Sequence, residues 1–152
     1  MQIKLLKFKL KYNNNMIETL LLPLIGKELF SKVFSETSDN IYNGLSELRK
    51  YTHYNFDNLI EQLDIETKIK IIDAYIKHTD TESSEPIKIS IESIICIITK
   101  INKEINDINT EIEAHNNKWF HSFRNPHIKD KIHNLINHSI IFDKRIDLLL
   151  KL

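Results

Sequence analysis

The stretch that decides the fold is residues 91–112, which read IESIICIITKINKEINDINTEI. Isoleucines recur in it at alternating intervals of three and four residues, which is the spacing of one buried stripe along an α-helix. The stripe consists of Ile91, Ile94, Ile98, Ile101, Ile105, Ile108 and Ile112. His115 and Trp119 continue it, and polar residues occupy the opposite positions. The pattern predicts one amphipathic helix of roughly 45–50 Å.

A second apolar series with the same spacing follows the Asn125-Pro126 break. Its members are Ile128, Ile132, Leu135, Ser139, Phe142, Ile146 and Leu149. Because the connection near residues 122–126 is short, the two helices are expected to be antiparallel neighbours. Residues 87–152 are therefore predicted to form a long coiled-coil-like hairpin, in which the two series meet as a helix seam. Oligomerisation through the same helices is the alternative, because all-isoleucine seams favour three- or four-stranded assemblies.

The first half of the chain predicts shorter helices. Apolar residues at helical spacing indicate helices over residues 17–34 and 41–51, and the capping residues 37–40 indicate a loop between them. Asn55 and Asp64 are candidate N-caps, each followed by a further helix.

The expected organisation is a single compact all-α domain. A basic extension, residues 1–16, precedes a helical module, residues 17–78, which packs on the base of the hairpin. An acidic, proline-terminated linker, residues 79–86, separates the module from the hairpin. Two glycines and three prolines in 152 residues are too few for turn-rich folds and favour helices.

Composition also limits the function. The 21 basic and 21 acidic residues balance, which disfavours a protein dedicated to non-specific nucleic-acid binding. Cys96 is the only cysteine, so an intramolecular disulfide is excluded and a reducing compartment is expected. No segment approaches the roughly 20 apolar residues of a membrane span. We therefore expect an intracellular protein that is neither secreted nor membrane-spanning.

Two clusters are candidate contact sites. The predicted hairpin tip gathers Trp119, Phe120, Phe123, Arg124 and His127. Such residues could stack on bases or lie at a membrane interface, or they could simply close the end of the two-helix core. The extension carries Lys4, Lys7, Lys9 and Lys11, which could approach an anionic membrane or nucleic acid, or could remain a solvated terminus.

No residue pattern indicates catalysis. The seven histidines include no pair spaced like the ligands of a metalloprotease helix. Asp143 and Asp147 share a helix face, but no third ligand or general acid accompanies them. We interpret His115 as part of a hydrogen-bonded layer of the seam and prefer this interpretation to a pH switch. We expect no enzyme activity, cofactor, metal or small-molecule substrate.

Three segments of the second half carry a resemblance. These are HNNKWF at residues 115–120, Arg124 with Pro126, and FDKRIDLL at residues 142–149. They resemble the C-terminal part of small uncharacterised helical proteins from low-GC giant DNA viruses, over roughly residues 87–152. The resemblance implies a viral origin, which agrees with the heavy use of isoleucine, asparagine and lysine, but it implies no activity.

The leading hypothesis is a non-enzymatic structural or assembly protein. It would act through helix–helix contacts with other protein subunits, its own copies or different chains, and the virion is one candidate location. The alternative is a membrane- or nucleic-acid-associated binding module that uses the lysine-rich N-terminus and the aromatic, basic tip.

Overall fold

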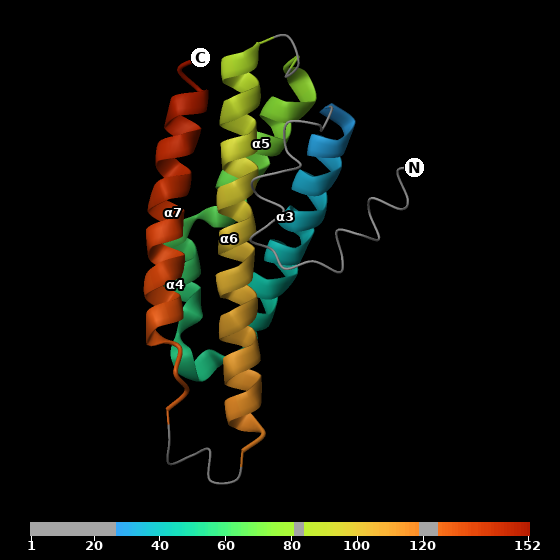
Figure 1. Ribbon diagram of the computed structural model, residues 1–152. Helices are drawn as coiled ribbons and strands as arrows, with labels where there is room; N and C mark the ends of the chain where they lie inside the picture. The colour runs from blue at the N-terminus through green and yellow to red at the C-terminus, as the bar shows by residue number, and fades with distance from the viewer. Residues whose placement is uncertain (1–26, 81–83, 119–124) are drawn as a thin grey trace.

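The computed structural model describes residues 27–80, 84–118 and 125–152 of the chain (Figure 1). These residues form helices and no strand, which confirms the all-α prediction. The elements are α3 (Lys27–Lys50), the short 3₁₀ helix η2 (Thr52–Tyr54), α4 (Phe56–Leu63), α5 (Ile65–His78), α6 (Glu85–Asn116) and α7 (Lys129–Leu149).

The helices form an antiparallel bundle around α6. Figure 1 shows α3 running down the molecule, α4 and α5 returning together, α6 running down again and α7 running back up. Helix α6 lies between α3 and α7 and packs along both of them. Helix α5 contacts α3 and α7, so the broken arm α4–α5 closes the bundle on the remaining side.

The core is centred on the isoleucine stripe of α6. All seven of its isoleucines have an exposed fraction of 0%. Helix α7 covers one side of the stripe with Phe142 and Leu149, and α3 covers the other with Phe34 and Leu45. Each buried aliphatic side chain stabilises the fold by roughly 1.5–3 kcal/mol. A helix covered on two sides explains why the isoleucines of α6 are so numerous.

The loop predicted at residues 37–40 is wrong, because α3 continues through it without interruption. The hydroxyl of Ser38 is buried and donates a 2.7 Å hydrogen bond to the carbonyl of Phe34, one turn earlier. A serine satisfied in this way is tolerated inside a helix. The apolar spacing also continues from Phe34 to Ile41 and Leu45, so both sides of the polar segment bury on the same face.

The two helices predicted after residue 55 are present, but the capping roles assigned to Asn55 and Asp64 are wrong. Neither side chain makes a capping hydrogen bond within the described residues. Both residues instead adopt the left-handed conformation, with φ of 52° and 46°. Asparagine and aspartate tolerate this conformation better than most residues, so they act as the joints at which the chain changes direction.

The joint between α4 and α5 is held from two sides. The Leu63 carbonyl, next to the joint, accepts hydrogen bonds from Lys68 Nζ at 2.6 Å and from the buried Ser139 hydroxyl of α7 at 3.4 Å. Lys68 also pairs with Asp143 of α7 at 2.6 Å. These side-chain donors satisfy the Leu63 carbonyl at the point where the helix is interrupted, and they fix α7 against the joint.

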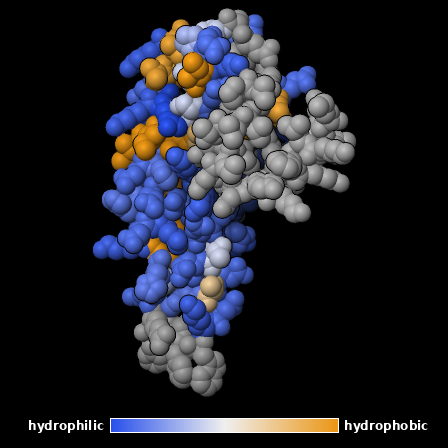
Figure 2. All heavy atoms as spheres, viewed as in Figure 1, coloured by the Kyte–Doolittle hydropathy of each residue, from blue (hydrophilic) through white to orange (hydrophobic). Residues whose placement is uncertain are grey.

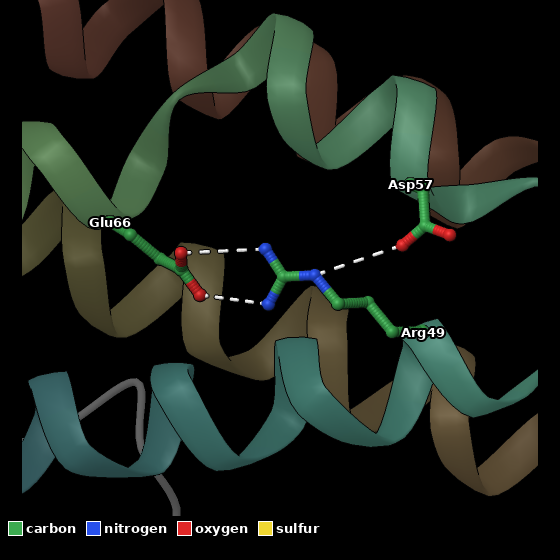
Figure 3. Close-up of polar contacts among 3 residues, drawn as sticks. All are labelled: Arg49, Asp57 and Glu66. Atoms are coloured by element: carbon green, nitrogen blue, oxygen red, sulfur yellow. Dashed lines mark hydrogen bonds and ion pairs between the residues drawn. The ribbon is translucent and has the colours of Figure 1, made fainter.

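Arg49 of α3 links the same arm from the opposite side (Figure 3). Its Nη1 and Nη2 donate to the two carboxylate oxygens of Glu66 on α5, at 3.0 and 3.4 Å. Its Nε lies 3.8 Å from Asp57 Oδ1 on α4. One guanidinium therefore sets the position of both halves of the broken arm relative to α3.

Helix α6 includes the last two residues of the predicted linker. Glu85 and Pro86 belong to the first turn of α6, so the helix begins two residues before the predicted start of the hairpin. Proline fits there because the first-turn N–H groups have no partner inside the helix. The basic extension, residues 1–16, and the predicted start of the module, residues 17–26, lie outside the described residues.

Candidate functional site on the outer face of helix α7

The predicted helix seam is core within a single chain. In α7, Leu135, Phe142 and Leu149 are at most 1% exposed, Ile128 and Ile146 are also buried, and Ile132 is partly buried. With the stripe of α6 also buried, the seam is already occupied by the chain's own helices. In this single-chain fold the seam is therefore not exposed to another subunit.

Only one residue of the two predicted contact clusters lies within the described residues. Trp119, Phe120, Phe123 and Arg124 lie outside the described residues, as do Lys4, Lys7, Lys9 and Lys11. His127 is described and is exposed, whereas His115 is buried in the seam as expected. Beside the tip, His53 and Tyr54 of η2 and the start of α7 line an open, mainly apolar hollow of about 380 Å³.

A surface that the sequence analysis did not single out lies on the solvent side of α7. Ile140, Ile141 and Leu148 are 47%, 38% and 58% exposed, which is unusual for large apolar side chains grouped on one helix. Lys144 and Asp147 lie among them and are exposed. We call these five residues the α7 outer face. Figure 2 shows hydrophobic residues gathered over the upper left of the molecule, where the C-terminal half of α7 runs in Figure 1.

The helical repeat explains this arrangement. Residues seven apart lie on nearly the same line along a helix, so Ile141 and Leu148 are aligned, as are Ile140 and Asp147. The buried line contains Phe142 and Leu149. The sequence contains a signal for this surface. The runs 140–142 and 148–150 each hold three consecutive apolar residues, whereas a single buried seam needs fewer. Only one residue of each run is buried.

Two partly buried titratable side chains, Glu92 on α6 and His138 on α7, have shifted pKa values. Burial raises the pKa of the Glu92 carboxyl, opposed by the charge of Lys88. Burial also lowers the pKa of His138, opposed by the charge of Glu104. Glu92 Oε1 and His138 Nδ1 have no hydrogen-bond partner within the described residues.

The described residues contain no group of three or more histidine, cysteine, aspartate or glutamate side chains that could hold a metal ion. Among the described helices, none has an apolar stretch long enough to cross a membrane. The α7 outer face is therefore the feature that the structure adds to the candidate sites.

The chain is similar in sequence to a viral protein. The chain is 34% identical over 93 residues to an uncharacterized protein of Acanthamoeba polyphaga mimivirus. The match covers 61% of this chain and 44% of the relative, so the chain spans less than half the length of that protein. The predicted resemblance to giant-virus proteins is confirmed. No protein-family model matches the chain, and no solved structure matches it.

Proposed function

We propose that the protein is a virus-encoded, non-enzymatic assembly protein that docks onto other protein subunits through the α7 outer face. One observation carries the proposal: three large apolar side chains remain 38–58% exposed on one helix, although the same chain buries the isoleucine stripe of α6 completely. Grouped apolar side chains rimmed by charges are typical of protein contact surfaces.

Covering this surface contributes favourable free energy to a contact with another protein. Burying the exposed part of one isoleucine or leucine side chain contributes on the order of 1 kcal/mol. Three such side chains offset part of the cost of association, and the charges of Lys144 and Asp147 select the orientation of the partner. A regular helix also presents these groups on a rigid support, which reduces the entropy lost on binding.

The similarity to an uncharacterized mimivirus protein supports a viral origin, and the virus particle is the place of action that we propose. Quantitative mass spectrometry of purified virus particles and of infected-cell fractions tests this part of the proposal. We expect the protein to be enriched in particles at a fixed ratio to the major structural proteins. Recovery only in the cell fractions, at no fixed ratio to any other protein, would overturn the particle assignment.

Native mass spectrometry of the tagged full chain, purified from producing cells, tests docking. We expect a complex of fixed stoichiometry, heavier than the 18.0 kDa chain, which the double variant Ile141→Lys/Leu148→Lys no longer forms. The matched control is Ile71→Lys, because Ile71 is 45% exposed but lies on α5. A chain that is monomeric in every preparation, or a complex that the double variant leaves intact, would contradict the proposal.

Co-sedimentation with anionic liposomes and with DNA at two salt concentrations tests the competing function. Binding at low salt that disappears on removal of Lys4, Lys7, Lys9 and Lys11, and that the α7 variants do not affect, would favour a membrane- or nucleic-acid-binding module instead.

A further inference from the structure

We propose that His138 makes the packing of α7 on α6 sensitive to acid. While its imidazole is neutral the two helices stay packed together, and protonation of the ring favours a state in which this part of α7 has separated from α6. The inference concerns the α6–α7 interface and not the α7 outer face, so it does not rest on the proposed function.

The antiparallel pairing of α6 and α7 places His138 opposite two charged residues (Figure 1). The guanidinium of Arg145 on α7 donates a hydrogen bond to the Ser93 carbonyl of α6, so these two residues lie at the same level. Positions seven residues apart lie on nearly one line of a helix. His138 precedes Arg145 by seven residues on α7. Lys100 follows Ser93 by seven residues on α6, so His138 lies level with Lys100, and Glu104 lies one turn further along α6.

The immediate surroundings of the imidazole favour its neutral form. His138 is partly buried, and its Nδ1 atom is buried with no hydrogen-bond partner within the described residues. A protonated imidazole carries an N–H group on both ring nitrogens. Protonation in the closed interface would therefore leave a buried donor unsatisfied, which costs free energy that the separated state does not lose.

Two charges of α6 act on the imidazole in opposite directions. The negative charge of Glu104, a residue only 8% exposed, favours the protonated ring, whereas the positive charge of Lys100 disfavours it. Burial has the largest effect and outweighs the attraction to Glu104, so the pKa of His138 is lowered. The neutral imidazole is therefore the form that fits the closed interface.

The other elements around α7 bring no further charge against the ring. On α7 itself the residues three and four positions from His138 are uncharged, and Lys131 and Arg145 lie two turns away. The arm α4–α5 reaches α7 on the side of Ser139, where Lys68 of the arm is paired with Asp143. The response to acid at this position is therefore decided by burial and by the two charges of α6.

Proton linkage fixes the direction and the size of the effect. Because the folded chain holds the His138 proton less tightly than the unfolded chain, its contribution to stability is fully present above the ordinary value of 6.5. It is lost as the pH falls from that value through the pKa of the folded state. One proton changes an unfolding equilibrium constant by at most about tenfold per pH unit, so a change of about two- to tenfold is expected between pH 7.5 and pH 5.5.

NMR titration of the imidazole protons in the full chain measures the pKa of His138 directly. We expect a midpoint below 6.5. Glu104→Gln should lower the midpoint further because it removes the charge that favours protonation, and Lys100→Gln should raise it because it removes the opposing charge. A midpoint at or above 6.5, or shifts of the opposite sign in the two variants, would overturn the proposal.

Urea unfolding at pH 7.5 and pH 5.5 tests the effect on stability. His138→Gln keeps a polar side chain that does not titrate, so it should lose the two- to tenfold share of the pH dependence that His138 supplies. The matched control is His133→Gln, because His133 is exposed on the same helix and its replacement should leave the pH dependence unchanged. Circular dichroism verifies that both variants are folded, and the NMR titration decides the question if His138→Gln is not. A folded His138→Gln protein with the full pH dependence of the wild type would contradict the role of His138.

Hydrogen exchange measured by mass spectrometry locates the acid effect within the chain. After correction for the intrinsic exchange rate at each pH, the amides of α7 should lose protection by about two- to tenfold at pH 5.5, whereas those of α3 should not. His138→Gln should abolish this difference between the helices. An equal loss of protection in α3 and α7 would show that acid unfolds the whole chain, and it would overturn the proposed separation of α7.

Discussion

Replacing Gly44 by alanine tests the closest approach between α3 and α6. A Cβ atom at this position would lie 2.5 Å from Cγ2 of Ile105, well inside van der Waals contact. Ile105 is completely buried and β-branched, so its Cγ2 cannot move aside without a change of backbone or rotamer. At the same place Asn109 Nδ2 donates a 3.0 Å hydrogen bond to the Gly44 carbonyl, which ties the two helices together.

Two opposing effects decide how much Gly44→Ala changes the free energy of unfolding. Overpacking a filled core costs about 1–3 kcal/mol, and a clash as short as this one belongs to the upper part of that range. Alanine favours a helix over glycine by about 1 kcal/mol, which acts in the opposite direction. We therefore expect Gly44→Ala to lower the free energy of unfolding by roughly 1–2 kcal/mol. Helix propensity alone predicts the opposite sign.

Urea unfolding followed by circular dichroism at equilibrium measures the change. Ser46→Ala, at an exposed position of the same helix, is the control and is expected to alter stability by less than about 0.5 kcal/mol. Ile105→Leu removes the clashing Cγ2 at nearly constant volume. The double variant Gly44→Ala/Ile105→Leu should therefore lose less stability than the sum of the losses of the two single variants. A Gly44→Ala protein as stable as the wild type, or strictly additive single changes, would refute the close crossing.

Three further predictions follow from buried and charged side chains. Burial raises the pKa of Glu92 above its ordinary 4.5, so the folded state binds a proton more tightly than the unfolded state and loses stability as pH rises through the folded pKa. Glu92→Gln should therefore raise the melting temperature at pH 7 more than at pH 4, and an equal change at both would contradict this. Ile101→Ala should cost about 2–5 kcal/mol in urea unfolding, whereas Ile89→Ala, at a 56% exposed position, should cost below about 1 kcal/mol; similar costs would refute the assigned core. Arg49→Lys removes one of two hydrogen bonds to Glu66 and should lower stability by about 0.5–1 kcal/mol at low salt and less at high salt; a loss that does not depend on salt would argue against an electrostatic origin.

Several local features were predictable from the sequence because a helical repeat is a local property. The isoleucine spacing identified α6 and its buried stripe, and the second series identified the buried line of α7 from Leu135 to Leu149. The two further helices expected after Asn55 and Asp64 are present as α4 and α5. In each case apolar side chains at intervals of three and four can be buried only if the backbone is helical.

The tertiary structure decided what lies against each helix. Capping preferences suggested a loop around Ser38, but burial of Phe34 and Ile41 on a common face outweighed them. The joint at Asp64 is held by Lys68 and by residues of α7 that are distant in the sequence.

The exposure of the α7 outer face also depended on the assembled bundle. The run 140–142 is uniformly apolar in sequence, and the bundle covers Phe142 while leaving Ile140 and Ile141 open. The physical reason is that a repeat fixes only the angular position of each side chain around its own helix axis. Which of those directions faces a neighbour, and which faces solvent or another molecule, depends on how many helices surround it.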